Sequence, residues 1–375
     1  MKTVAITSNT SWYLYNFRRN TIKALLGEGY RVLTLAPRDA YSSKLEKLGA
    51  EFLHIPIDQG GTNPLSDLKT LWCFYRSYRK LSPDVVLNFT PKNNIYSTLA
   101  ASIQDIPCIN NIAGLGLIFI NENFTANLAR LLYRISQPRA KRIFFQNDED
   151  KELFLKGRFA KEELTHRLPG SGVDLQRFAA SPAPNDGTVR FLLVARMLRE
   201  KGICEFVEAA RILTRRYDNL EFNLLGHLDV NNPSAISSKE MRQWHDEGII
   251  NYLGVSDQVE QIIATADCIV LPSYYREGVP KSLLEGAAMA KPLITTRNIG
   301  CKDTVDDGIN GYLCEIRNTD DLVNKLEKII AMPYQQRLDM GNKSREKMER
   351  DFDEKIVIKK YLGAISSVLD QTTNQ

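Results

Sequence analysis

The chain has 375 residues, of which 43% are hydrophobic and 25% charged, and its formal net charge is +4. This length predicts two or three domains of about 100–200 residues each. The composition is that of a soluble globular protein, which excludes a largely disordered chain and a small disulfide-rich scaffold. No apolar run reaches the roughly 18 residues that span a bilayer, and the N-terminal residues lack the apolar core of a secretory signal.

Short β-branched runs alternate with amphipathic helical patterns along the N-terminal half of the chain. We expect strands at residues 2–7, 30–36, 50–55, 85–89, 106–112 and 142–146. We expect helices at residues 15–26, 65–81 and 124–136. This order predicts a parallel sheet with helices on both faces, because parallel strands are joined by crossover helices.

The alternation stops at residues 168–186, which are rich in Gly, Ser, Pro and Asp, and we interpret this segment as a linker. Further strands are expected at residues 189–194, 221–225, 250–253, 268–271 and 292–296. Further helices are expected at residues 203–216, 259–265, 283–289, 319–331 and 354–369. The sequence therefore predicts two doubly wound α/β domains, 1–170 and 171–352, facing across a cleft, and a C-terminal segment 353–375. Ligands of such sheets bind beyond the carboxyl ends of the strands.

The segment from Leu271 to Glu285 predicts a buried strand, a loop and a helix that begins near Pro280. Glu277 and Glu285 lie eight residues apart, or roughly 12 Å at about 1.5 Å per residue, which is similar to the distance from hexose to ribose in a nucleotide sugar. The helix N-terminus between them attracts phosphate, and Gly278 permits close backbone approach. We predict that one carboxylate binds sugar hydroxyls and the other ribose hydroxyls. The alternative is an acidic loop beside a solvated helical glutamate, which is the commoner meaning of the spacing alone.

Arg196 and Lys201 follow the first expected strand of the second domain. Both can reach a diphosphate there, Arg196 through a planar fork of donors and Lys201 as a compact charge. In sugar transfer the leaving group is a nucleoside diphosphate, so neutralising its charge is the main electrostatic task. The alternative is a pair of solvated basic residues at the start of a helix.

These segments together resemble glycosyltransferase family 4, which comprises retaining enzymes of the GT-B fold with two Rossmann-like domains. The resemblance rests on Arg196, Lys201-Gly202, the run EGVPKSLLE and the strand end Leu224-Leu225-Gly226. In the N-terminal half it extends to YNFR at 15–18, FTPKNN at 89–94, GLG at 114–116, QN at 146–147 and GSGVD at 170–174. These latter segments are similar to bacterial N-acetylgalactosaminyltransferases that act on polyprenyl-diphosphate-linked saccharides.

The resemblance implies an acceptor-binding first domain, a nucleotide-sugar-binding second domain and a C-terminal helix that crosses back onto the first. It implies that Glu277 contacts the donor hexose at the reaction centre and that Glu285 holds the ribose. The diphosphate would be bound by Arg196, Lys201, Gly278, Val279 and Ser282. The acceptor side of the cleft would be lined by Asn9, Thr10, Ser11, Arg18, Lys92, Asn110 and Asn111.

The sequence departs from the family pattern at two places. Many members carry a Gly-Gly pair after the first strand, where this chain has Asn9-Thr-Ser-Trp12, and many carry a cleft histidine that the stretch 110–116 lacks. The group that handles the acceptor's proton therefore stays open. A retaining transfer in which the leaving phosphate takes this proton needs no enzymic base.

Basic residues are concentrated in the first half of the chain. Residues 1–175 contain 23 Lys and Arg against 16 Asp and Glu, a net +7, and the remainder is −3. Two expected helical segments, 72–80 and 128–142, combine cations with aromatic or apolar side chains, which favours an interfacial contact with anionic headgroups. The alternative is a pair of helices that pack their apolar side chains on the sheet and solvate their cations. No nucleic-acid-binding motif is present, so we expect no nucleic-acid partner.

Other features argue against metal and redox chemistry. The six cysteines form no CxxC pair, which is typical of reduced thiols in a cytosolic protein. The strings Asp148-Glu-Asp150 and Asp351-Phe-Asp353 precede expected helices, where aspartate is a common capping residue, so we predict no metal and no other cofactor. The first strand is not followed by GxGxxG, which argues against an NAD-dependent oxidoreductase.

The sequence thus predicts a retaining glycosyltransferase that moves an N-acetylhexosamine, of GalNAc or GlcNAc type, from a UDP-sugar to a polyprenyl-diphosphate-linked saccharide. Such an enzyme would act in surface polysaccharide or glycan assembly, for example of O-antigen or capsule. We expect it in the cytoplasm, peripherally bound to the inner face of the cell membrane. The alternatives are a UDP-sugar epimerase of the same fold and a glycosyltransferase that uses a different UDP-hexose.

Overall fold

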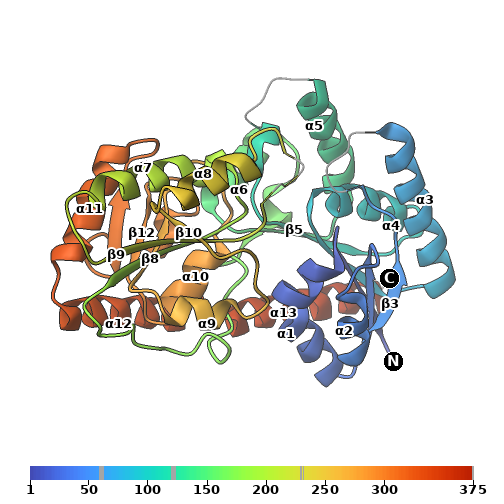
Figure 1. Ribbon diagram of the computed structural model, residues 1–375. Helices are drawn as coiled ribbons and strands as arrows, with labels where there is room; N and C mark the ends of the chain where they lie inside the picture. Colours follow the sequence, from blue (N-terminus) through green and yellow to red (C-terminus); the bar gives the residue numbers. More distant parts are fainter. Residues whose placement is uncertain (59–62, 120–123, 229, 231, 374–375) are drawn as a thin grey trace. The chain divides into compact units, whose positions relative to one another are not determined.

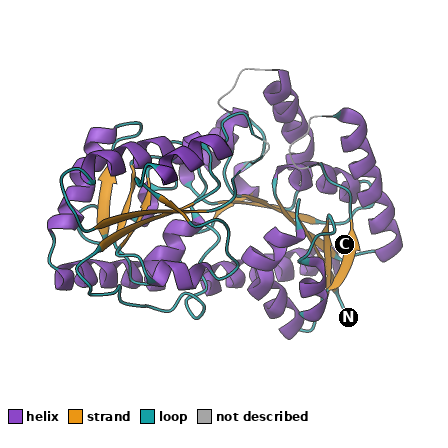
Figure 2. Cartoon of the chain, in the orientation of Figure 1, coloured by secondary structure: helices purple, strands orange, loops and turns teal. Residues whose placement is uncertain are grey.

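The computed structural model describes all residues except 59–62, 120–123, 229, 231 and 374–375 (Figure 1). By their internal contacts the residues form two units. Unit 1 comprises Met1–Ser171 and Lys355–Gln375, and unit 2 comprises Gly172–Glu354. Each unit is built around its own β-sheet (Figure 2).

Unit 1 contains a seven-stranded parallel sheet in the order β3-β2-β1-β4-β5-β6-β7. Its strands are β1 (Thr3–Thr7), β2 (Arg31–Ala36), β3 (Glu51–His54), β4 (Val85–Phe89), β5 (Cys108–Ile112), β6 (Arg142–Phe145) and β7 (Thr165–Arg167). The order reverses direction between β1 and β4, where Val4 pairs with Val32 on one side and with Val85 on the other. Such a switch point is where doubly wound sheets bind ligands.

Helices cover both faces of this sheet. They are α1 (Ser11–Gly27), α2 (Ser42–Lys47), α3 (Pro64–Leu81), α4 (Thr98–Ser102), α5 (Phe124–Ser136), α6 (Asp148–Lys156) and α13 (Glu354–Thr373), and a π-turn spans Asn93–Ser97. One apolar core joins Ile6, Leu87 and Ile109 to Tyr361 of α13. A second core on the other face joins Val86 and Ile143 to α3 and α5. Because both faces are buried, strands such as β1 and β4 are apolar throughout rather than alternating.

Unit 2 contains a six-stranded parallel sheet in the order β10-β9-β8-β11-β12-β13. Its strands are β8 (Val189–Val194), β9 (Leu220–Leu225), β10 (Asn251–Tyr252), β11 (Cys268–Leu271), β12 (Leu293–Thr296) and β13 (Gly311–Cys314). Its helices are α7 (Ile203–Leu213), α8 (Ser238–Asp246), α9 (Val259–Ala264), α10 (Lys281–Ala288), α11 (Thr319–Ala331) and α12 (Tyr334–Asp351). In Figure 1, α7, α8 and α11 lie on one side of the sheet and α9, α10 and α12 on the other. The switch point of this sheet lies between β8 and β11.

The predicted fold class, two doubly wound α/β domains, is confirmed by these two sheets. Helix α12 is absent from the sequence prediction, because half of its 18 residues are charged and its buried residues are Met340, Gly341, Ser344, Lys347 and Met348. Of the two acidic strings, Asp148-Glu-Asp150 forms the first turn of α6 as expected. In the second string, Asp353 directly precedes α13 as predicted, but Asp351 is the last residue of α12. Across the part of the chain that the structure describes, no helix combines the length and the apolar character needed to cross a membrane.

Candidate active site

Two loops meet at the carboxyl ends of β8 and β11, the strands that flank the switch point of unit 2. The first loop carries Arg196 and Lys201, and the second runs from Pro272 to Pro280. They are joined through the Glu200 carbonyl oxygen, which accepts hydrogen bonds from the backbone N–H groups of Tyr274 (2.9 Å) and Tyr275 (3.1 Å). The structure therefore brings together the two segments that the sequence singles out.

Glycine is required where these loops approach other backbone. Gly202 has φ +79°, and a Cβ atom there would lie 2.2 Å from the carbonyl oxygen of Pro272. Gly300 has φ +75°, and its Cβ would lie 1.5 Å from the carbonyl oxygen of Gly278. Neither position accepts a side chain without movement of the backbone, so the two glycines fix the shape of this strand edge.

Lys201 and Glu277 form an ion pair between the two loops. Their side chains are 12% and 11% exposed, so the pair is mostly shielded from water. The Glu277 carboxylate also lies 3.1 Å from the Ser273 hydroxyl, and the Lys201 ammonium lies 5.0 Å from the centre of the Tyr275 ring. The residue predicted to bind the diphosphate and the residue predicted to contact the hexose are thus in direct contact.

Arg196 lies two residues after the end of β8 and is exposed. Its charge acts on Tyr275, whose pKa is raised by burial and by the negative charge of Glu277, and is lowered in part by Arg196. Arg196 is therefore electrostatically coupled to the same ring that lies beside Lys201. The two predicted phosphate-binding cations therefore both interact with Tyr275.

Helix α10 begins directly after this loop, with Pro280 as its N-cap residue in an extended conformation. A proline side chain cannot hydrogen-bond the first N–H groups of the helix, and these groups carry the positive end of its dipole. Gly278 and Val279 are buried beside the helix start, and Ser282 in its first turn is partly exposed. The start of α10 thus has backbone N–H groups that its N-cap side chain does not satisfy, and the loop before it carries Glu277, the partner of Lys201.

Glu285 lies one turn further along α10. Burial raises its pKa to about 7, an effect that the positive charges of Lys281 and Arg177 reduce and the negative charge of Glu260 increases. Lys281 itself donates a hydrogen bond to the carbonyl oxygen of Gly172 at 2.7 Å. Glu285 is therefore a carboxyl group whose protonation changes near neutral pH.

The predicted acceptor-side residues lie at the carboxyl edge of the unit 1 sheet, but few of them are exposed. Asn9 and Thr10 are partly exposed after β1, and the Thr10 side chain caps α1 by accepting from the Tyr13 N–H at 3.0 Å. Ser11 is buried and donates to the carbonyl oxygen of Pro37 at 2.8 Å. Lys92 is paired with Asp67 of α3 at 2.6 Å.

Arg18, Asn110 and Asn111 are at most 1% exposed. The Arg18 guanidinium lies 4.2 Å from the centre of the Phe89 ring and donates to the Ser171 hydroxyl at 3.1 Å. The Asn110 amide accepts from Asn88 at 2.9 Å and donates to the Gln137 side chain at 2.9 Å. Direct contact with an acceptor, as predicted, would require exposed side chains, whereas these three side chains are buried. The contacts of Arg18 and Asn110 are those of residues that position the strand edge, whereas the buried side-chain amide of Asn111 has no hydrogen-bond partner among the described residues.

Sequence reasoning did not select Ser273 or Asn298. Asn298 donates to the carbonyl oxygens of Ser273 (3.3 Å) and Tyr275 (2.6 Å), and thereby holds the loop that presents Glu277. Ser273 could have been predicted from its position in the sequence, two residues after a buried strand and four residues before Glu277.

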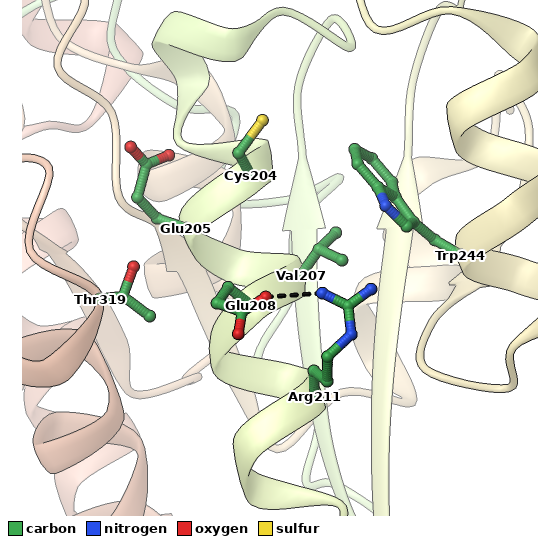
Figure 3. Close-up of a pocket in the computed structure, with 7 residues that line it drawn as sticks. All are labelled: Cys204, Glu205, Val207, Glu208, Arg211, Trp244 and Thr319. Carbon is green, nitrogen blue, oxygen red and sulfur yellow. Dashed lines mark hydrogen bonds and ion pairs between the residues drawn. The ribbon is translucent and has the colours of Figure 1, made fainter.

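A separate hollow of about 330 Å³ lies in unit 2 on the outer side of α7 (Figure 3). It is lined by Cys204, Glu205, Val207, Glu208, Arg211, Trp244 and Thr319. Glu208 and Arg211, which lie one turn apart on α7, form an ion pair along that helix at 2.6 Å. The predicted donor-binding residues are not among those that line it.

Both halves of the chain match known protein families. Residues 176–347 match the family described as glycosyl transferases group 1, and residues 3–147 match the family described as glycosyl transferase 4-like. The chain is a glycosyltransferase of the GT-B fold, with a 4-like first half and a group 1 second half. Similar curated proteins include an N,N'-diacetylbacillosaminyl-diphospho-undecaprenol alpha-1,3-N-acetylgalactosaminyltransferase of Campylobacter jejuni, 28% identical over 98% of this chain and 99% of that protein. The capsular polysaccharide glycosyltransferase CapM of Staphylococcus aureus is 25% identical over 84% of each chain.

Solved structures support the same fold for this glycosyltransferase. A glycosyltransferase of Rickettsia africae has a TM-score of 0.77 at 17% identity, with 98% of each chain covered. HepE of Anabaena, solved with UDP and glucose, has a TM-score of 0.78 at 16% identity, with 98% of this chain and 100% of HepE covered. These structures confirm the predicted GT-B fold, and the family matches confirm the predicted glycosyltransferase.

Proposed function

We propose that this glycosyltransferase is a retaining enzyme that moves an N-acetylhexosamine from a UDP-sugar to a saccharide carried on polyprenyl diphosphate. The observation that carries the proposal is the ion pair between Lys201 and Glu277 in the loop before α10, with the charge of Arg196 acting on Tyr275 of the same loop. The site combines cations for a diphosphate with a carboxylate for a sugar, and both lie at the switch point of the sheet.

In this proposal the diphosphate is bound by Arg196, Lys201 and the backbone around Gly278, Val279 and Ser282. Glu277 contacts the hexose, and Glu285 accepts hydrogen bonds from the ribose hydroxyls. The burial of Glu285 supports this last role, because a desolvated carboxylate gains more from two hydroxyl donors than an exposed one.

The transfer proceeds on one face of the sugar. The bond between the anomeric carbon and the phosphate oxygen breaks, and the acceptor oxygen bonds to the same carbon from the same side. The leaving phosphate oxygen takes the acceptor's proton, so no enzymic base is required in the stretch 110–116, which has no histidine. Lys201 and Arg196 stabilise the charge that develops on the leaving diphosphate.

The choice of acceptor is supported by the relatives. The Campylobacter protein is named for a diphospho-undecaprenol acceptor. An Escherichia coli protein that is 24% identical over 71% of each chain is named as a UDP-Gal:alpha-D-GlcNAc-diphosphoundecaprenol alpha-1,3-galactosyltransferase. The two names share the lipid carrier and differ in the sugar. We propose an N-acetylhexosamine as the donor sugar because the Campylobacter protein, which matches nearly the whole chain, is named as an N-acetylgalactosaminyltransferase.

Two helices of unit 1 support contact with a membrane surface. On α3, Leu65, Leu68 and Trp72 are 78%, 61% and 54% exposed and share one helix face. The Arg76 guanidinium lies 4.6 Å from the centre of the Trp72 ring. Exposed apolar side chains flanked by cations are typical of helices that rest on anionic headgroups.

Helix α5 has a similar exposed face, formed by Phe124, Leu131 and Ile135. The exposed cations Arg134 and Lys141 lie on and just after this helix. We propose that α3 and α5 bind the enzyme peripherally to the cytoplasmic face of the cell membrane, where a lipid-linked acceptor is found.

The membrane part is tested by sedimentation with vesicles. The double variant Trp72→Ser/Leu131→Ser is expected to lose at least about fivefold in binding to anionic vesicles, while Ile309→Ser, an exposed apolar residue of unit 2, changes little. Equal binding of all three proteins would contradict the role of α3 and α5.

The catalytic part is tested by incubating the enzyme with a panel of UDP-sugars, with and without a polyprenyl-diphosphate-linked saccharide. We expect an extended lipid-linked product with a UDP-N-acetylhexosamine. Interconversion of UDP-sugars without acceptor would support an epimerase instead. Product with only a UDP-hexose would correct the sugar.

A further inference from the structure

The charge state of Glu285 depends on three charged side chains that come from different segments of unit 2. The positive charges of Lys281 and Arg177 favour its carboxylate form, and the negative charge of Glu260 opposes it. Among the residues that the structure describes, none forms a hydrogen bond or an ion pair with the Glu285 side chain. Its ionisation therefore depends on how these three neighbours are held.

Lys281 lies one turn before Glu285 on α10. Residues four apart in a helix lie on the same face, so the two side chains are neighbours. The Lys281 ammonium donates a hydrogen bond to the carbonyl oxygen of Gly172 at 2.7 Å. This bond fixes the place of the positive charge, which a fully solvated lysine side chain would not do.

The carbonyl oxygen that accepts from Lys281 belongs to a segment that is itself held in place. In the next residue, Val173, the N–H group donates to the carbonyl oxygen of Phe352 at 2.8 Å, and the carbonyl oxygen accepts from the Glu354 N–H at 3.1 Å. Val173 is fully buried in the core of unit 2. Gly172 is therefore held by its neighbour, and Lys281 is held by Gly172.

The segment that holds Lys281, the run GSGVD at 170–174, also holds Arg177. The Asp174 carboxylate accepts from the Arg177 N–H at 3.0 Å. The Arg177 guanidinium pairs with Glu260 of α9 at 2.9 Å, so its positive charge is partly offset. Lys281 consequently has the larger effect on the carboxylate.

We propose that Lys281 is a positioning residue for Glu285, in which the bond to Gly172 places a positive charge one turn before this carboxylate and keeps it ionised for the ribose hydroxyls. The proposal rests on the proposed function, because it requires Glu285 to bind the ribose. An ionised carboxylate offers both oxygens as acceptors, whereas a protonated one carries a donor on one of them. Lys281 thereby sets the lowest pH at which the donor is bound tightly.

Calorimetric titration with UDP between pH 6 and pH 9 tests the role of Lys281. Lys281→Met removes the positive charge, so the pKa of Glu285 rises and affinity is lost at a higher pH. We expect the midpoint of the affinity–pH curve to rise by at least about 0.5, with UDP bound at least about twofold more weakly at pH 7 and within about twofold of the natural affinity at pH 9. Lys281→Arg, which keeps the charge, should behave like the natural protein.

Two further variants serve as controls for this titration. Glu285→Gln supplies the pH dependence that comes from the phosphates of UDP alone. Lys325→Met removes a lysine of α11 that also lies one turn from a carboxylate, Asp321, at 3.6 Å. It should leave the whole curve unchanged, because neither residue belongs to the donor site.

Glu260→Gln tests the sign of the effect. This variant removes a negative charge and takes from Arg177 its carboxylate partner, and both changes lower the pKa of Glu285. We expect the midpoint to fall by at least about 0.3, in the direction opposite to that of Lys281→Met. A general loss of structure cannot move the midpoint in opposite directions, and thermal melting shows whether the variants are folded.

The outcomes separate the two proposals. If Glu285→Gln flattens the curve but Lys281→Met keeps the natural midpoint, only the role of Lys281 is overturned. A loss of affinity in Lys281→Met that is equal at every pH overturns it too, because it would indicate direct contact with the diphosphate or a structural role. If UDP does not bind, or Glu285→Gln keeps the natural curve, the ribose site and the inference both fall.

Discussion

Lys201 and Lys92 each follow a parallel strand, and each forms an ion pair, yet their surroundings differ. Lys92 pairs with Asp67 of α3, whose other carboxylate oxygen accepts from the Tyr96 hydroxyl at 2.8 Å. That pair joins the π-turn Asn93–Ser97 to α3. Lys201 and Glu277 join two strand-end loops beside an uncapped helix N-terminus, with Arg196 nearby. The difference indicates that a lysine–carboxylate pair predicts a binding site only where other groups that can bind the same ligand, such as a second cation or a helix N-terminus, lie close to it.

The largest effect is expected at the carboxylates of the two pairs. Glu277→Gln should lower turnover at least about 1000-fold, because it removes the charge proposed to lie at the reaction centre. Asp67→Asn should lower turnover less than about fivefold. Steady-state kinetics with the best UDP-sugar measures both, and equal losses in the two variants would erase the distinction.

The lysines should differ in the same sense but by less. Lys201→Ala should weaken UDP binding at least about tenfold, whereas Lys92→Ala should leave it within about twofold. A diphosphate loses a direct charge partner in the first variant only. Calorimetry with UDP measures both affinities, and a loss that is as large in Lys92→Ala would place the comparison in doubt.

The buried polar groups of unit 1 should affect stability rather than UDP binding. Asn110→Ala removes one hydrogen bond from each of the buried side chains of Asn88 and Gln137, so we expect a loss of about 1–3 kcal/mol in the free energy of unfolding. Asn9→Ala, at a partly exposed position, should cost less than about 0.5 kcal/mol. Denaturant unfolding measures both, and an unchanged midpoint for Asn110→Ala would argue against a positioning role.

Glu285 predicts a pH dependence of UDP binding. Its pKa is raised to about 7, so the carboxylate that can accept two ribose hydroxyls is the main form above pH 7 and is lost as the pH falls below it. UDP affinity should fall about threefold or more between pH 8 and pH 6. Glu285→Gln should retain only the dependence that comes from the phosphates of UDP. The same slope in both proteins would remove Glu285 from the ribose site.

The smallest expected effect is that of EDTA, which should leave turnover unchanged. Asp148 is paired with Arg167 at 2.6 Å and Asp351 with Arg350 at 2.7 Å, so these acidic strings have structural partners. Turnover that falls with EDTA and returns with a divalent cation would contradict the expectation.

Much of the fold follows from local sequence pattern, because buried parallel strands such as Val85–Phe89 and Cys268–Leu271 are continuous apolar runs between polar turns. Helix α12 does not follow from it, since its charged sequence has no apolar period. In the site, Lys201 and Glu277 are predictable because strand ends of one parallel edge converge. The burial of Arg18 and Asn110 is not, because polar side chains that satisfy one another inside a core have the same composition as those that meet a ligand.

The central claim is that a nucleoside diphosphate binds at the start of α10 through Lys201 and Arg196. Its most direct test is the ratio of affinities for UDP and for uridine monophosphate, measured by calorimetry on the natural protein and on Lys201→Ala/Arg196→Ala. We expect the natural protein to favour UDP at least about tenfold and the double variant to bind the two nucleotides nearly equally. An undiminished preference for UDP in the double variant would contradict the claim.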